Sequence, residues 1–121
     1  MLAILAFAIA SLSPTEARST PAFMQAAQLE ALCGAGAEMA DLELCAGYIL
    51  GSVDQVLAEQ DVWGRRRAVL CLPADVTVDQ LKAVVMAHAA ARPDQKDSAA
   101  AALIASALKS AYPCLPRRGG R

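Results

Sequence analysis

The sequence predicts an all-α fold, a small disulfide-bonded bundle of four helices, or five if a short segment adds one. Three observations support this prediction. Residues 42–57 are apolar on nearly every side when placed on a helix, which is typical of the central helix of a domain. Four cysteines are spread along the chain, and proline and glycine turns separate the remaining helical segments.

The segment 1–17 has the features of a secretory signal peptide. Residues 2–12 are almost wholly apolar, no basic residue precedes them, and small residues follow around Ala17. Such a run is too short to span a bilayer and is typical of an export signal. We therefore expect cleavage between residues 17 and 19, and the alternative is a hydrophobic N-terminal helix of the folded domain.

The remaining chain has the length of one compact domain, which we expect to cover residues 18–116. Cleavage after Ala17 would remove one acidic residue and leave equal numbers of acidic and basic residues. A neutral protein has no electrostatic basis for binding nucleic acid or a membrane surface. We expect the basic tail, residues 117–121, to be disordered.

The first helix is predicted from its two ends. Thr20 followed by Pro21 is a typical helix start, and Gly34 is a typical stop after Cys33. The second helix is the central one, which we expect to run from residue 40 or 41 to about residue 60.

Two glycines interrupt the apolar surface of the central helix. Gly47 and Gly51 are four residues apart on one side, where the absence of a Cβ atom lets another backbone approach. Since glycine costs about 1 kcal/mol relative to alanine inside a helix, we expect close packing here against a neighbouring helix or a second subunit.

Two further helices are expected to form a hairpin around Pro93. Thr77 and Gln80 have the spacing of a capping box, which predicts a third helix over residues 78–91. The fourth helix is expected over residues 98–112, with residue 97 or 98 as its N-cap.

The four cysteines predict two disulfides, because an even number of cysteines behind an export signal is typical of an oxidised protein. The alternative, a zinc site, uses closely spaced Cys and His pairs, which this sequence lacks. The helix order favours the local pairs Cys33–Cys45 and Cys71–Cys114, worth about 3 and 4 kcal/mol respectively from loop closure. The crossed pairings remain open.

Two polar segments are candidates for contact with a partner protein. Residues 61–67 combine the sole tryptophan with three arginines, a composition typical of interaction hot spots. Residues 92–96 form a charged turn, and we expect charge reversal at Arg92 to weaken partner binding with little effect on the melting temperature. A solvated surface is the alternative for both segments. The candidate contact residues are Trp63, Arg65, Arg66, Arg92, Asp94, Gln95 and Lys96.

An ordered set of motifs extends over residues 29–114. A cysteine-led Gly-Tyr-Ile-x-Gly helix at Cys45–Gly51 is followed by Cys71-Leu-Pro73 and by a terminal Tyr112-Pro113-Cys114. In this order and spacing the motifs resemble the Rap/Tai family of type VI secretion immunity proteins. The resemblance implies a periplasmic helical protein, often a homodimer, that binds and blocks a peptidoglycan amidase delivered by a neighbouring cell.

Inhibition by occlusion requires no catalytic residue, cofactor or metal, so the resemblance implies a protein that is not an enzyme. The residues agree, because no catalytic set, phosphate loop or ligand cluster is present. His88 could be a catalytic base or a metal ligand, but without a nucleophile or second ligand we expect a packed, hydrogen-bonded histidine. A periplasmic stress chaperone and a structural envelope protein are the alternative functions.

Overall fold

A computed structural model describes residues 22–115, apart from the side chain of Arg65. The predicted signal peptide and the predicted disordered tail lie outside the described residues. The described chain is all-α, which confirms the predicted fold class. Its elements are α1 (Ala26–Cys33), α2 (Met39–Trp63), the short 3-10 helix η1 (Arg65–Arg67), α3 (Val78–Ala90), the short 3-10 helix η2 (Pro93–Gln95) and α4 (Ala100–Ala111).

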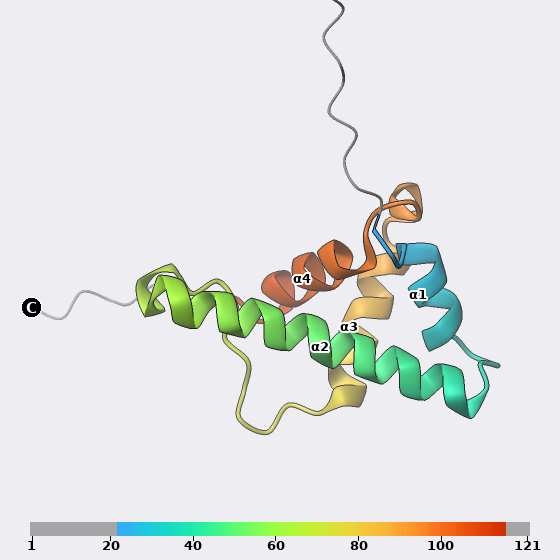
Figure 1. Ribbon diagram of the computed structural model, residues 1–121, viewed down its shortest axis with the longest axis horizontal. Helices are drawn as coiled ribbons and strands as arrows, with labels where there is room; N and C mark the ends of the chain where they lie inside the picture. Colours follow the sequence, from blue (N-terminus) through green and yellow to red (C-terminus); the bar gives the residue numbers. More distant parts are fainter. Residues whose placement is uncertain (1–21, 116–121) are drawn as a thin grey trace, which may run out of the picture.

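Helix α2 is the longest element and organises the bundle. It runs along the long axis of the molecule, with α1 near one end and η1 at the other, and it contacts α1, α3 and α4 (Figure 1). Its buried residues, Cys45, Ile49 and Val53, form one face, as predicted. They pack in a single core with buried side chains of the other helices, among them Leu29 of α1 and Val85 of α3. Each large apolar side chain buried in this way contributes roughly 1.5–3 kcal/mol.

The outer face of α2 differs from the prediction. The helix is not buried nearly all round, since Leu44 and Leu50 are 52% and 39% exposed. Apart from the neighbouring residues and backbone of α2 itself, no atom of the described chain lies within 4 Å of the position that a Cβ would occupy at Gly47 or Gly51. The predicted close approach of a neighbouring helix is therefore wrong, because the packed helices leave this face of α2 uncovered. A subunit contact at the glycines stays a prediction.

The start of α1 also differs from the prediction, since the helix begins at Ala26 and not near Pro21. Met24 and Gln25 lie against the start of α4, where Ala100 N–H donates to the Met24 carbonyl over 2.9 Å. Gln25 N–H donates to the Gln28 side chain over 2.8 Å and caps the helix. A tertiary contact therefore sets this boundary.

The other boundaries are closer to the predictions. The capping box of α3 is confirmed, because Gln80 N–H donates to Thr77 Oγ1 over 3.2 Å and Thr77 N–H donates to Gln80 Oε1 over 2.9 Å. Helix α2 extends three residues beyond the expected end, to Trp63. The predicted side-chain cap of α4 is wrong: the N-cap is Ala99, and Ser98 Oγ instead donates to the Gln95 carbonyl over 2.6 Å.

Two disulfides hold the bundle together in the predicted local pairing. Cys33 at the end of α1 is bonded to Cys45 in α2, and both residues are buried. Cys71, before α3, is bonded to Cys114, after α4. Beside this second bond, Cys71 N–H donates to the Tyr112 carbonyl over 3.0 Å. The second disulfide thus joins the two ends of the α3–α4 hairpin.

Replacing Cys71 and Cys114 together with alanine should lower the free energy of unfolding by about 4 kcal/mol, since the bond closes a long loop with a sequence separation of 43. Urea denaturation of the variant and the wild type measures the difference. The wild type in reductant is the control and should lose at least as much stability. A loss below about 1 kcal/mol in the variant would contradict the prediction.

Replacing Gly47 or Gly51 with alanine should stabilise the protein by about 1 kcal/mol each, because a methyl group at either position meets no neighbour and alanine favours the helix. Thermal unfolding of each variant at low protein concentration measures the effect. Destabilisation by either change would contradict the prediction.

Candidate functional site

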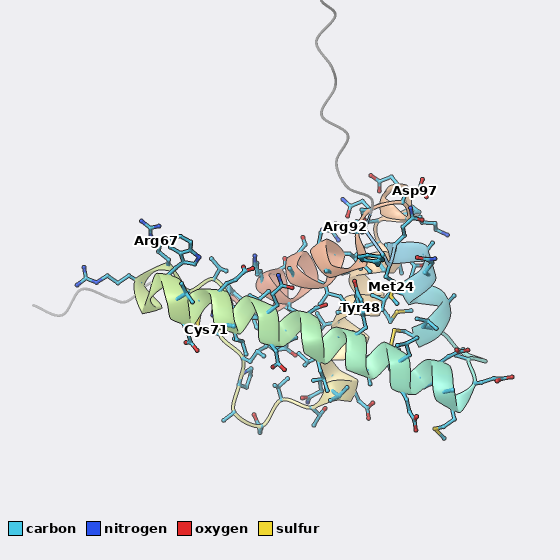
Figure 2. All side chains as sticks on the ribbon, in the orientation of Figure 1. Met24, Tyr48, Arg67, Cys71, Arg92 and Asp97 are labelled. Carbon is cyan, nitrogen blue, oxygen red and sulfur yellow. A yellow bond between two sulfur atoms is a disulfide. The ribbon has the colours of Figure 1, made fainter. Side chains whose placement is uncertain are left out.

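The two predicted contact segments lie at opposite ends of the molecule. Figure 2 shows Arg67 at the C-terminal end of α2, and Arg92 and Asp97 at the far end beside α1. The structure therefore does not bring Trp63 and the turn 92–96 into one surface. Within residues 22–115 no group of His, Cys, Asp and Glu has the geometry of a metal site, and no helix has the length and hydropathy to cross a bilayer.

The tip of the turn between α3 and α4, residues 94–96, presents three exposed polar side chains, Asp94, Gln95 and Lys96, and Asp97 beside the tip is exposed as well. The short helix η2 shapes it, and Gln95 N–H donates to the Arg92 carbonyl over 3.0 Å. Ser98 closes the turn, because its backbone N–H and its hydroxyl both donate to the Gln95 carbonyl, over 3.1 and 2.6 Å. Its tip thus combines an acid, an amide and a base on a short, hydrogen-bonded backbone.

The same turn is attached to the start of α1. Ala26 N–H donates to the Ser98 carbonyl over 2.9 Å, and Ala27 N–H donates to the Lys96 carbonyl over 3.0 Å. The first N–H groups of a helix have no acceptor within the helix. These two bonds therefore supply acceptors to the N–H groups at the start of α1, and they also hold the backbone of the turn against α1. The turn is therefore held in one conformation before any partner binds.

Arg92 supports the turn from the other side. Its Nη1 lies 3.1 Å from Nδ1 of His88 and 3.4 Å from the His88 carbonyl. Arginine has no acceptor, so Nδ1 accepts the bond and the imidazole is neutral, with its proton on Nε2. Nε2 is buried and has no hydrogen-bond partner among the described residues. Charge reversal at Arg92 would therefore disturb the turn itself, contrary to the expectation of an unchanged melting temperature.

The environment of His88 lowers its pKa below the ordinary value of 6.5. Burial is the larger cause, and the positive charge of Arg92 is the second. Both disfavour the imidazolium form, which could not accept the hydrogen bond from Arg92. The predicted packed, hydrogen-bonded histidine thus has one nitrogen bonded and the other buried.

The second predicted segment surrounds the end of α2. Trp63 is the last residue of the helix and is 68% exposed, and Gly64 ends the helix with a φ of 85°, a conformation that favours glycine. Arg66 is exposed, and the side chain of Arg65 is not among those that the structure describes. Sequence reasoning missed Gln60 and Lys109, which line a pocket beside Trp63, because no local pattern connects α2 with α4.

The free energy of unfolding should decrease as the pH falls below 6.5, since the unfolded chain protonates His88 before the folded protein does. The decrease due to His88 should end once the pH is below its lowered folded pKa. His88→Gln removes this contribution, so the stability of the wild type minus that of the variant should fall between pH 8 and pH 5. Urea denaturation across this range measures it, and identical pH profiles would contradict the assignment.

The comparisons with known proteins identify a family. The family model of Rap1a immunity proteins matches residues 25–114, which is about three quarters of the chain and includes all four cysteines, both candidate contact segments and His88. No curated protein and no solved structure matches the chain. With a match of this extent over the whole four-helix domain, the chain belongs to the Rap1a immunity protein family.

Proposed function

We propose that this protein acts in the periplasm as an immunity protein that binds and inhibits a peptidoglycan amidase delivered by type VI secretion. Family membership supports the immunity function. The two disulfides and the apolar N-terminal segment support action outside the cytoplasm, because disulfides persist in oxidising compartments.

The observation that carries this proposal is the rigid turn at residues 92–96. Hydrogen bonds from the N–H groups of α1 hold its backbone, and the side chain of Arg92 is bonded to His88. The side chains at its tip, Asp94, Gln95 and Lys96, are all exposed. A fixed, convex, polar element suits occlusion of a concave active site, and its rigidity reduces the entropy cost of binding.

The proposed activity is inhibition without a chemical step in this chain. The four cysteines are oxidised, and the imidazole of His88 is committed to Arg92 inside the protein. Inhibition would instead follow from exclusion of peptidoglycan from the amidase. No cofactor takes part in such a mechanism.

The exposed face of α2 favours two further roles, a contact between two copies of the chain and the binding of unfolded proteins. Its apolar side chains could be covered by a second copy, in the homodimer that the family resemblance implies, or could bind unfolded clients, as in a periplasmic stress chaperone. The exposed residues are Met39, Leu44, Leu50 and Val62. A chaperone would suppress aggregation of several unrelated unfolded proteins at low pH, whereas the proposed inhibitor binds one folded amidase.

Lys96→Glu should weaken inhibition of the partner amidase about tenfold, because a charge at the tip of the turn would meet the enzyme directly. The measurement is the release of peptides from purified peptidoglycan by a type VI amidase encoded beside this gene, at increasing concentrations of each inhibitor variant. The melting temperature should stay within about 2 °C of the wild type, since Lys96 is exposed.

Lys82→Glu is the matched control. It makes the same charge change in the first half of α3, at the opposite end of that helix from the turn, and should inhibit as the wild type does. Equal weakening of inhibition by Lys82→Glu and Lys96→Glu would show that inhibition depends on the net charge of the protein and not on contact through the turn. Failure of the wild type to inhibit the amidase would contradict the proposed function.

A further inference from the structure

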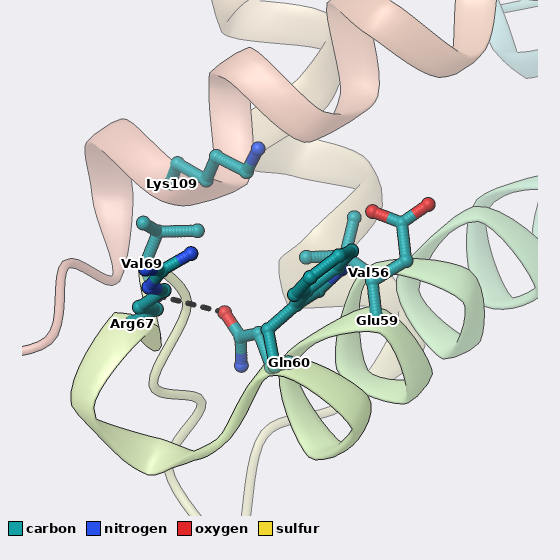
Figure 3. A pocket seen from close by; sticks show the side chains of 7 residues that line it. Val56, Glu59, Gln60, Arg67, Val69 and Lys109 are labelled. Atoms are coloured by element: carbon teal, nitrogen blue, oxygen red, sulfur yellow. Dashed lines mark hydrogen bonds between the residues drawn. The ribbon is translucent and has the colours of Figure 1, made fainter.

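A pocket of about 320 Å³ lies beside the end of α2 (Figure 3). Its Arg67 is at the opposite end of the molecule from Arg92 of the turn (Figure 2). Val56, Gln60 and Trp63 line it from α2, and Lys109 enters from α4. The chain that follows η1 forms the remaining wall with Val69. The pocket thus lies at the junction of two helices and a connecting segment.

Gln60 fixes the wall of the pocket. Its Oε1 accepts hydrogen bonds from Val69 N–H over 2.8 Å and Leu70 N–H over 2.7 Å, and its Nε2 donates to the Leu70 carbonyl over 3.0 Å. Leu70 is buried and pairs with Pro113, and the disulfide at Cys71 follows directly. The pocket is therefore preformed, and a ligand would not bear the cost of ordering its wall.

The lining combines apolar surface with separated charges. Val56, Val69 and Trp63 supply the apolar part. Figure 3 shows Arg67 and Lys109 near the Val69 side and Glu59 on the other side, where its carboxylate accepts a hydrogen bond from Gln55 over 3.3 Å.

The two cations are available to a ligand. Arg67 and Lys109 form no side-chain hydrogen bond with any other described residue. The lining thus holds two cations against the single carboxylate of Glu59, which favours a further carboxylate from another molecule.

We infer that this pocket binds a carboxylate attached to an apolar group, presented by an acidic segment of a partner protein. The carboxylate would accept hydrogen bonds from Arg67 and Lys109, a charge-assisted contact, while the apolar group would pack on Trp63, Val56 and Val69. A volume of about 320 Å³ has room for one such side chain and its backbone. The identification of the partner as the amidase rests on the proposed function. The inferred binding of a carboxylate in the pocket does not depend on that identification.

The test uses N-acetyl-leucine as the probe and Trp63 as the reporter, because it is the only tryptophan in the chain. At constant ionic strength the probe should change the Trp63 fluorescence in a saturable manner, with a dissociation constant on the order of 1 mM. N-acetyl-leucinamide, which lacks the charge, and acetate, which lacks the apolar group, should each bind about tenfold more weakly.

Charge variants locate the binding. Arg67→Glu and Lys109→Glu should each weaken N-acetyl-leucine binding about tenfold, and Arg66→Glu is the matched control, because Arg66 lies in the same 3-10 helix but does not line the pocket. The inference is wrong if the fluorescence change does not saturate, if acid and amide bind equally, or if Arg66→Glu weakens binding as much as Arg67→Glu. The titration contains no amidase, so its failure would leave the proposed inhibition standing.

Discussion

The buried disulfide between Cys33 and Cys45 is the constraint on which the proposed binding turn depends. It fixes the end of α1 against the second turn of α2, where both cysteines are in the core. With α1 in place, the N–H groups at its other end meet the carbonyls of Lys96 and Ser98. Because α1 has only two turns, a short helix that would not persist alone in water is made rigid by these contacts. The turn is therefore as well ordered as the core that supports it.

The sequence predicted the elements whose signals are local. The capping box at Thr77 gave the start of α3 because its two hydrogen bonds join residues three apart. The start of α1 was missed because it depends on the bond between Ala100 N–H and the Met24 carbonyl, which joins distant parts of the chain. The exposed face of α2 was missed for a related reason: hydropathy does not distinguish a surface covered by the same chain from one left open.

The candidate site likewise has features that the local sequence predicted and features that depend on distant contacts. Charge and proline identified the turn 92–96, and its tip residues Asp94, Gln95 and Lys96 are exposed. The sequence could not show that Arg92 points back to His88, because arginines in turns more often extend into solvent. Nor could it show the pocket at Trp63, since Lys109 reaches it from a helix more than forty residues further along the chain.

The two disulfides support different ends of the molecule. Cys33–Cys45 positions α1 and, through it, the turn 92–96, whereas Cys71–Cys114 closes the α3–α4 hairpin beside Leu70, whose backbone Gln60 holds at the wall of the Trp63 pocket. Since the two surfaces share no hydrogen bond in the described chain, a change that disorders one end need not disorder the other. A small domain with one core can in this way present two separately supported surfaces, and a partner that reached both would have to extend along α2.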